Sequence, residues 1–521
     1  MEHRLILTID CGTQSTRVII FDENGNILEK SKIEYDPYFQ AKPGYAEQDA
    51  NIFWNAIIKG CKEIFARSPQ LKDMIAVVGV TTQRDSMVLV DRDGNPIRPV
   101  ITWLDQRKAK PNFIPKGVEA LAYKLVGMYE SILKTQAEGS CNWLKQNEAE
   151  NWKKGYKFLQ VSGFINFKLT GKFVDSIASQ IGHIPFNYKK QRWAKDGELP
   201  TKLFSIEKEK LPDLVSPANI IGSISKEASM STGIKEGIPV VACGSDKGCE
   251  TLGVGCVFPN SASLSFGTTA TVQVTSRKYF EPLSFMPAYP AVFPGYYNPE
   301  VEIFRGYWLI SWFKREFCHQ EVILAEKEGI APEIILNKAL KETPAGSMGL
   351  VVQPFWSPGL KTPFAKGAII GFGDVHTKKY MYRAVIEGLA FALKDGLKKI
   401  EKVGKLKVEK LFVSGGASQA DEICQIAADV FKLPIYRGKT YETSSLGAAI
   451  ICSVGVNIHP DLQQAIEKMI SYEKVFYPDE ENSQIYDKLY EKVYSKMYKR
   501  LSPLYKEIMR ITGYPETYSQ L

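Results

Sequence analysis

The chain has 521 residues and a mass of 58.5 kDa, which at roughly 100–200 residues per domain corresponds to two to four domains and excludes a lone small binding module. Hydrophobic residues make up 44% and charged residues 24%, an ordinary globular composition that excludes disordered and fibrous classes. The formal net charge of +8 is scattered along the chain and forms no basic tract, so nucleic acid is not an expected partner.

The apolar runs 74–80 and 448–452 are far shorter than the roughly 18–20 residues that a membrane helix needs. Leu5–Ile9 is also too short for the core of a signal peptide and leads directly into Asp10. The nine cysteines form no Cys-x-x-Cys pair, and the five histidines are scattered, which is typical of reduced thiols without a zinc site. We therefore expect a cytoplasmic protein that does not cross a membrane.

The N-terminus has the pattern of three strands joined by tight turns. Leu5–Asp10 predicts a strand, residues 11–15 a polar turn, and Arg17–Phe21 a second strand. Asn24-Gly25 is a typical hairpin turn and leads to a third strand near Ile27–Tyr35.

A second strand-turn-strand pattern begins about half the chain later. Ala262–Phe266 and Ala270–Val274 predict strands, and the Gly-Thr-Thr turn 267–269 lies between them. Two similar openings predict a duplicated α/β fold with one domain per half and a boundary near residue 255.

Helices and strands alternate in both halves, as α/β domains require. One predicted helical face comprises Phe53, Ile57, Cys61, Ile64 and Phe65. Its counterpart in the second half comprises Met381, Ala384, Val385 and Leu389. Strands over 74–81 and 408–414 follow these two helices.

A long helical run forms the C-terminus. Apolar residues recur every four positions, at Ile485, Leu489, Val493, Met497 and Leu501, with Tyr486, Tyr490, Tyr494 and Tyr498 beside them. This pattern favours a helix packed on a domain surface, with a partner-binding stripe as the alternative.

The first turn carries a group of residues suited to phosphate and metal binding. Gly12 lets backbone N–H groups approach phosphate oxygens, and Thr13 and Arg17 add a hydroxyl donor and a cation. Asp10 can hold Mg²⁺ directly or through water. A plain hairpin turn is the alternative interpretation.

Two further loops offer similar chemistry. Gly267 and Thr268 form the turn of the second hairpin, and two such loops facing each other would clamp a polyphosphate across a cleft. Gly415, Gly416 and Ala417 lie between a predicted strand and a helix, where glycines permit close approach to a nucleotide-sized ligand.

Asp246 follows a short apolar strand and precedes a glycine-containing turn. An acid in this position is well placed to accept a proton from a substrate hydroxyl. The alternative is that Asp246 caps a helix beginning near Cys249, and both roles are compatible.

A polar cluster follows two other predicted strands. Gln83, Arg84 and Asp85 end the first, and Trp103 follows the second. A cation, an acid and an aromatic ring suit a polyol, whose hydroxyls need paired donors and acceptors and whose C–H face packs on a ring. Surface salt bridges are the alternative.

Together these motifs resemble the FGGY carbohydrate kinases, a branch of the sugar-kinase, actin and chaperone ATPase superfamily. The matching segments, in chain order, are 9–13, 83–84, 103–107, 244–246, 266–268, 371–388, 415–417 and 442–449. The resemblance implies two ribonuclease-H-like, actin-like ATPase domains flanking a catalytic cleft. It implies a sugar-binding domain over 1–255 and an ATP-binding domain with the C-terminal helix over 256–521.

The resemblance also implies roles for particular residues. Asp246 would be the catalytic base, and Asp10 and Asp246 would hold Mg²⁺. The substrate would contact Gln83, Arg84, Asp85, Trp103, Asp246 and Lys247. ATP would contact Gly12, Thr13, Arg17, Gly267, Thr268, Gly415, Gly416 and Ala417.

Within the family, the motif at Arg84 looks like that of glycerol kinases, whereas xylulokinases place Met-His-Gly there and no histidine is nearby in this sequence. Three departures separate the chain from glycerol kinases. Asp85 replaces a glutamate, Lys247 replaces a glutamine, and residues 135–140 lack the substrate tyrosine. These departures predict a substrate that differs from glycerol in size or charge.

The leading hypothesis is ATP-dependent phosphorylation of a primary hydroxyl on a small sugar or polyol, such as a pentulose. Glycerol kinase proper is one alternative. An actin- or chaperone-like ATPase that phosphorylates no small molecule is a second, and a catalytically weakened sugar sensor a third. A homodimer is compatible with the sequence, which leaves the oligomeric state open.

Overall fold

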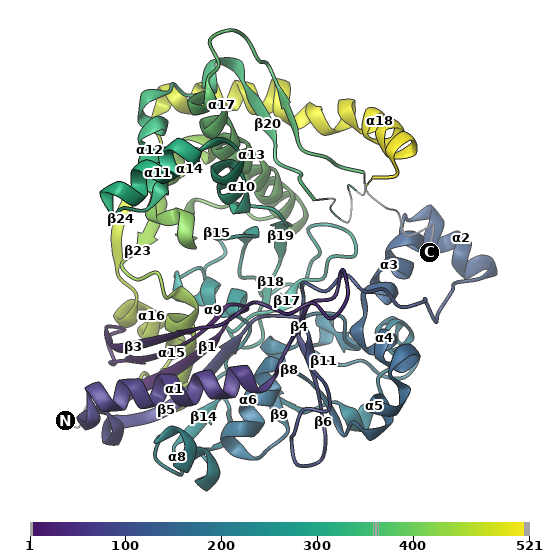
Figure 1. Cartoon of the computed structure of the whole chain (residues 1–521), viewed down its shortest axis with the longest axis vertical. Coiled ribbons are helices and arrows are strands. Elements are labelled where there is room, and N and C mark those ends of the chain that lie inside the picture. Colours follow the sequence, from purple (N-terminus) through teal and green to yellow (C-terminus); the bar gives the residue numbers. More distant parts are fainter. Residues whose placement is uncertain (1–3, 358, 360–361, 363, 515–521) are drawn as a thin grey trace.

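Two six-stranded sheets organise the chain, one in each half (Figure 1). The structure is a computed structural model that describes residues 4–357, 359, 362 and 364–514. The first sheet has the order β13-β14-β5-β1-β2-β3. Its strands are β1 (Leu5–Cys11), β2 (Ser15–Phe21), β3 (Ile27–Glu34), β5 (Ile75–Thr82), β13 (Ile220–Ser223) and β14 (Pro239–Val241).

The second sheet repeats this topology with the order β19-β16-β15-β22-β23-β24. Its strands are β15 (Ser261–Phe266), β16 (Ala270–Gln273), β19 (Glu300–Ile303), β22 (Lys410–Ser414), β23 (Ile435–Gly438) and β24 (Tyr472–Phe476). In each sheet the first strand lies centrally, antiparallel to the second and parallel to a later one. The prediction of a duplicated, ribonuclease-H-like α/β fold is confirmed.

Helices cover both sheets, and smaller sheets extend both halves (Figure 1). The remaining strands are β4 (Glu47–Gln48), β6 (Met87–Val90), β7 (Val100–Ile101), β8 (Lys157–Gln160), β9 (Val174–Ser176), β10 (Phe186–Asn187), β11 (Arg192–Trp193), β12 (Asp213–Val215), β17 (Tyr289–Pro290), β18 (Tyr297–Asn298), β20 (Val351–Gln353) and β21 (Ala368–Ile370). Other helices are α2 (Gly117–Leu125), α3 (Tyr129–Glu138), α4 (Ser140–Asn147), α5 (Ala149–Lys154), α6 (Val161–Thr170), α7 (Leu199–Leu203), α8 (Lys226–Thr232), α10 (Trp308–Phe317), α11 (His319–Glu328), α12 (Pro332–Glu342), α14 (Asp421–Phe431) and α16 (Leu462–Met469). Within the described part of the chain, no helix has the length and apolarity to span a membrane.

The two predicted helical faces are buried. Helix α1 (Asn51–Arg67) packs Phe53, Ile57, Cys61 and Ile64 into the core of the first half. Helix α13 (Lys378–Gly404) does the same in the second half with Ala384, Val385 and Leu389. Each face follows the 3.6-residue period that places side chains three or four positions apart on one side of a helix.

One helix from each half packs against the sheet of the other half. Helix α15 (Thr443–Gly455) lies in the second half of the chain, yet Leu446 and Ile450 pack with Ile6 and Val77 of the first sheet. Helix α9 (Asp246–Gly253) follows the first sheet, and its Glu250 and Thr251 hydrogen-bond to Ser265 and Gln273 of the second. In Figure 1 the two helices lie where the halves meet. The end of α9 that carries Asp246 is thereby fixed between the two halves.

The C-terminal run differs from the prediction in which side chains it buries. It comprises α17 (Glu480–Leu489), a π-helical turn (Tyr490–Tyr494) and α18 (Ser495–Thr512). Tyr486, Tyr490 and Tyr494 form the buried row against Phe391, whereas Ile485 is 42% exposed. The tyrosines occupy the buried face because their rings bury a large apolar area. The Tyr486 hydroxyl also donates a hydrogen bond to Glu387 at 2.7 Å.

Candidate active site

The first hairpin joins β1 to β2 at the edge of the cleft between the halves. Gly12 N–H donates to the Ser15 carbonyl at 2.9 Å, which closes the turn. The Thr13 hydroxyl donates to Gln83 Oε1 at 2.8 Å and accepts from Trp103 Nε1–H at 2.9 Å. The structure therefore brings the first turn together with two residues of the predicted polyol cluster.

Asp10 lies at the end of β1, opposite Arg17 in the register of β2. The Asp10 carboxylate is 3.7 Å from Arg17 Nη1, while Arg17 Nε lies 3.2 Å from Glu442. Burial raises the pKa of Asp10 to about 7, and the negative charges of Asp246 and Glu250 add to the rise. Two nearby carboxylates, Asp10 and Asp246, offer the hard oxygen ligands that Mg²⁺ prefers, so the donor set fits that ion.

Because the folded state raises the pKa of Asp10 from 3.8 to about 7, stability should fall as pH rises between these values. We expect Asp10→Asn to remove this dependence and to raise the free energy of unfolding at pH 8 by a few kcal/mol, at 1.36 kcal/mol per pKa unit. Urea unfolding at pH 5.5 and pH 8, without Mg²⁺ or substrates, measures the effect. Equal stabilities of variant and wild type at pH 8 would contradict it.

The second hairpin and the glycine loop after β22 pack directly on each other. Gly415 has φ +88°, and a Cβ there would lie 2.7 Å from the carbonyl carbon of Phe266. Only glycine combines that conformation with so close an approach. Gly416 faces open space, and Thr268 at the tip of the hairpin is exposed. The two loops thus form one continuous surface.

Asp246 is the first residue of α9, and the helix cap is Ser245. The Ser245 hydroxyl accepts from Gly248 N–H at 3.2 Å, so the capping role considered for Asp246 is wrong. Asp246 Oδ1 accepts only from the adjacent Lys247 N–H, at 2.8 Å, among the contacts of the described residues. Burial raises the pKa of Asp246, and the positive charges of Arg84 and Lys247 offset part of the rise.

Arg84 crosses the cleft. Its guanidinium lies 3.2 Å from Glu300 on β19 and 5.4 Å from the ring centroid of Tyr289. Burial alone would lower the pKa of Arg84, but the charges of Glu300 and Glu302 raise it above the usual value. Burial and the charge of Glu300 in turn raise the pKa of Glu302 to about 7. The salt-bridge alternative therefore applies to Arg84, but the bridge is buried and connects the halves.

Asp85 is held by a histidine that is distant in sequence. Asp85 has φ +55°, and its carboxylate accepts from His183 N–H at 2.9 Å and contacts His183 Nδ1 at 2.6 Å. A Cβ at Gly182 would overlap the Asp85 carboxylate, so glycine is required beside it. Burial lowers the pKa of His183, but Asp85 outweighs burial and the net shift is upward. No histidine is near this motif along the sequence, but the fold brings His183 to Asp85.

Lys247 lines a pocket next to Arg84, yet its ammonium points to the second hairpin. Lys247 Nζ donates to Glu250 at 2.7 Å and to Ser265 at 2.6 Å. A Cβ at Gly267 would lie 3.9 Å from the same nitrogen. The predicted contact of Lys247 with the substrate stays a prediction, because its ammonium is paired with Glu250 and Ser265 in this structure.

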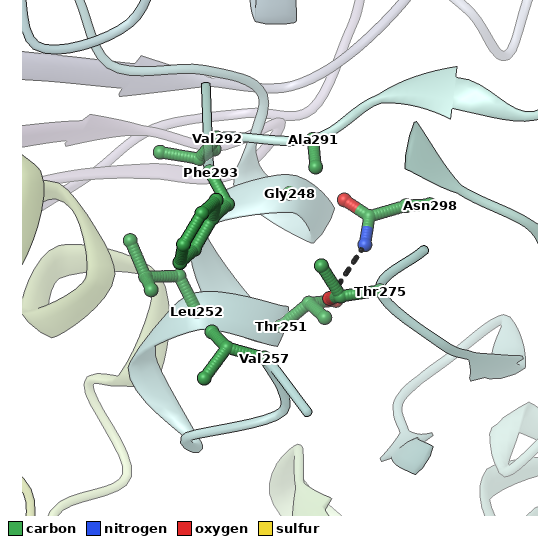
Figure 2. Close-up of a pocket in the computed structure, with 9 residues that line it drawn as sticks. All are labelled: Gly248, Thr251, Leu252, Val257, Thr275, Ala291, Val292, Phe293 and Asn298. Carbon is green, nitrogen blue, oxygen red and sulfur yellow. Dashed lines mark hydrogen bonds between the residues drawn. The ribbon is translucent and has the colours of Figure 1, made fainter. Parts of the chain in front are cut away.

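Two small pockets adjoin the start of α9. The first, shown in Figure 2, carries no charged side chain and is lined by Gly248, Thr251, Leu252, Val257, Thr275, Ala291, Val292, Phe293 and Asn298. The second is lined by Arg84, Ile181, Ser245, Lys247, Gly248, Gln273, Tyr289, Pro290, Asn298 and Glu300. Both pockets carry hydroxyl or amide groups, but the charged side chains Arg84, Lys247 and Glu300 line the second and none lines the pocket of Figure 2. The second pocket is thus richer in the donors and acceptors that polyol hydroxyls need.

The structure adds residues to this region that sequence reasoning missed. They are His183, Tyr188, Glu250, Gln273, Tyr289, Glu300 and Glu302. None belongs to a motif, because they come from the loop between β9 and β10, the turn between β10 and β11, helix α9, and the strands β16, β17 and β19. Their common sequence signal is weak: polar residues inside otherwise apolar strands, as at Glu300 and Glu302.

The duplicated sheets and the two hairpins near Asp246 define an actin-like, two-domain ATPase fold. Family models make the class specific: the N-terminal domain of the FGGY family of carbohydrate kinases matches residues 5–253, and its C-terminal domain matches residues 262–456. The chain belongs to the FGGY family of carbohydrate kinases. It is therefore an ATP-dependent phosphotransferase.

Individual proteins match over nearly the whole chain. Uncharacterized sugar kinase YgcE of Escherichia coli (strain K12) is 27% identical over 496 residues, covering 94% of this chain and 92% of that protein. A xylulose kinase of Staphylococcus epidermidis (strain ATCC 12228 / FDA PCI 1200) is 28% identical, covering 94% and 95%. The crystal structure of gluconate kinase from Lactobacillus acidophilus has a TM-score of 0.81 at 24% identity, covering 97% and 100%, which supports the fold.

Proposed function

We propose that this kinase transfers the γ-phosphoryl group of ATP to a primary hydroxyl of a sugar, polyol or sugar acid of four to six carbons. Asp246 takes the hydroxyl proton, because it lies half-buried at the start of α9 and its carboxylate accepts one hydrogen bond among the described residues. The observation that carries this proposal is the pocket at the start of α9. Arg84, Lys247 and Glu300 line it together with Ser245, the residue before Asp246.

The sugar would lie against residues of the first half. Arg84 and Gln83 supply donors, and the Gln83 side-chain nitrogen is buried without a partner among the described residues. Trp103 is 43% exposed and offers a ring face. Both carboxylate oxygens of Asp85 contact His183. We therefore assign the direct contact with a substrate hydroxyl to His183, which Asp85 holds in place.

ATP would bind mainly to residues 256–521 and the sugar mainly to residues 1–255. The continuous surface of Gly267, Thr268 and Gly415–Ala417 would hold the nucleotide, with Gly12, Thr13 and Arg17 closing on its phosphates. Mg²⁺, held by Asp10 and Asp246, would supply charge neutralisation of the phosphate oxygens.

Two features favour a substrate larger than glycerol. His183 widens the set of polar groups beyond Arg84 and Asp85, and Tyr188 and Tyr289 supply further ring faces 5.4 Å apart. The names of two similar proteins refer to xylulose and gluconate, which have five and six carbons. A site built to bind extra hydroxyls discriminates strongly against a substrate that lacks them.

A coupled ADP-release screen over glycerol, tetritols, pentuloses, hexuloses and aldonates tests the proposal. We expect the highest kcat/KM for a substrate of four to six carbons, with glycerol lower by roughly 10²-fold or more because buried donors would stay unpaired. Glycerol as the best substrate would show that the pocket is that of a glycerol kinase. ATP hydrolysis without any phosphorylated acceptor would favour an actin-like ATPase.

A further inference from the structure

One buried carboxylate connects the three functional loops of the cleft. Glu250 Oε1 accepts from Ser265 at 2.9 Å and from Ser414 at 2.6 Å, and Glu250 Oε2 accepts from Lys247 at 2.7 Å. Ser265 directly precedes the Phe-Gly-Thr turn, Ser414 directly precedes Gly415, and Lys247 directly follows Asp246. Glu250 is 7% exposed, so these contacts are shielded from water.

This arrangement fixes the Lys247 ammonium between the base and the second hairpin. The ammonium contacts Ser265, and the Cβ-free side of Gly267 lies next to it. An ammonium has three N–H donors, and the described residues accept two of them, at Glu250 and Ser265. The remaining N–H is available to a ligand that binds at the hairpin.

A structural role alone explains this largely buried pair poorly, in which the Lys247 and Glu250 side chains are 20% and 9% exposed. Desolvating an ammonium and a carboxylate is unfavourable, and apolar residues of similar volume often replace such pairs without loss of stability. A fixed positive charge, however, stabilises most where negative charge moves during phosphoryl transfer. Lys247 is the residue that directly follows the proposed base, and its ammonium contacts the residue before the Phe-Gly-Thr turn.

We propose that Lys247 is a catalytic residue that donates to a non-bridging oxygen of the transferred phosphoryl group, and that Glu250 is the positioning residue that holds it there. In the step, the sugar oxygen forms a bond to the γ-phosphorus while the bond from that phosphorus to the β,γ-bridging oxygen breaks. The electron pair leaves with ADP and the hydroxyl proton goes to Asp246. Lys247 stays protonated throughout. This inference rests on the proposed function, because it assumes the same reaction at the same site.

Kinetics of Lys247 variants give the first test. We expect Lys247→Gln to lower kcat by about 10²–10³-fold, the usual effect of removing one transition-state donor, and to change the KM of the sugar less than about threefold. Lys247→Arg, which keeps the charge, should recover part of kcat. An unchanged kcat with a raised sugar KM would instead make Lys247 a sugar-binding residue.

Binding of a transition-state mimic gives a second test without turnover. Lys247→Gln should weaken binding of ADP with aluminium fluoride and Mg²⁺ by about 10²-fold, while affinity for ADP alone stays within about threefold. Equal weakening for both ligands, or for neither, would overturn the proposal.

Glu250 and Ser265 are tested with a matched control on the same strand. Ser263 lies two residues before Ser265 in β15 and is buried like it, but makes no side-chain contact with Lys247. We expect Ser265→Ala and Glu250→Gln to lower kcat, with Ser263→Ala near wild type. Glu250→Gln combined with Lys247→Gln should lose little more than Lys247→Gln alone. Fully additive losses would show that Glu250 does not act through Lys247.

The two proposals can fail separately. If no sugar or polyol is phosphorylated, the proposed function is wrong, but basal ATP hydrolysis passes through the same phosphoryl transfer with water as acceptor. Lys247→Gln should then lower the hydrolysis rate while thermal unfolding shows a folded protein. Normal hydrolysis by the folded variant would overturn the role of Lys247.

Discussion

Asp246→Asn should lower kcat by about 10²–10⁴-fold, the range that a positioned general base contributes. Asparagine has the size of aspartate but cannot accept the hydroxyl proton. The fold should persist, because Ser245 caps α9 and because desolvation of the half-buried Asp246 carboxyl raises its pKa and so disfavours its charged form. The same coupled assay that identifies the substrate measures kcat, and calorimetric titration measures retained ATP binding.

Ser225→Ala is the matched control for this variant, because Ser225 caps α8 and lines neither pocket. It removes the cap hydrogen bond to Ala228 and should lower the free energy of unfolding by roughly 1 kcal/mol, while kcat stays within a few-fold of wild type. If Asp246→Asn turned over at a near-normal rate and only lost stability, Asp246 would be a structural residue and the base would lie elsewhere.

The sheets could be predicted from sequence because their strands are short, apolar and bounded by turn residues. Leu5–Asp10 and Ala262–Phe266 differ from β1 and β15 by one residue at one end. The Gly-Thr turns indicated the duplication, because the first strand of each half is followed by the same kind of turn, at Gly12-Thr13 and at Gly267-Thr268. The C-terminal helix shows the limit of periodicity: two parallel rows, one aliphatic and one of tyrosines, satisfy the same period, and packing against Phe391 decided between them.

The residues of the candidate site that follow strands could be predicted from sequence, whereas those that come from loops could not. Asp10, Gln83 and Asp246 stand at strand or helix ends, which parallel strands bring to one edge. The partner of Asp85 is His183, 98 residues away, and the partner of Arg84 is Glu300, 216 residues away. No local pattern encodes contacts of that separation. Lys247 was predicted to belong to the site, but the direction of its ammonium depends on Glu250. The contacts of Glu250 with Lys247, Ser265 and Ser414 form only in the folded chain.

The exchange of α9 and α15 between the halves depends on two glycines at their crossing. A Cβ at Gly447 would overlap the carbonyl oxygen of Cys249, and a Cβ at Gly253 would overlap that of Thr443. Such backbone approach is possible only without side chains at the contact. Because α9 carries Asp246 and Lys247, this crossing also sets where the proposed base and the ammonium lie.

Gly447→Ala should therefore destabilise the protein strongly. In an isolated helix the change would stabilise by up to about 1 kcal/mol, because alanine has the higher helix propensity. Here the new methyl group must push α9 away from α15, and overpacking of this kind costs about 1–3 kcal/mol or more when the obstacle is backbone. We expect a net loss in the free energy of unfolding and a fall in kcat, as the shift moves Asp246 and Lys247.

Gly438→Ala is the control for this substitution. A Cβ at Gly438, at the end of β23, meets nothing closer than 3.6 Å, so the change should leave stability and kcat near wild type. Urea unfolding of both variants and the wild type, followed by circular dichroism, measures the difference. If Gly447→Ala were as stable as Gly438→Ala, the two helices could separate at little cost. The crossing would then not be what holds the catalytic end of α9 in place.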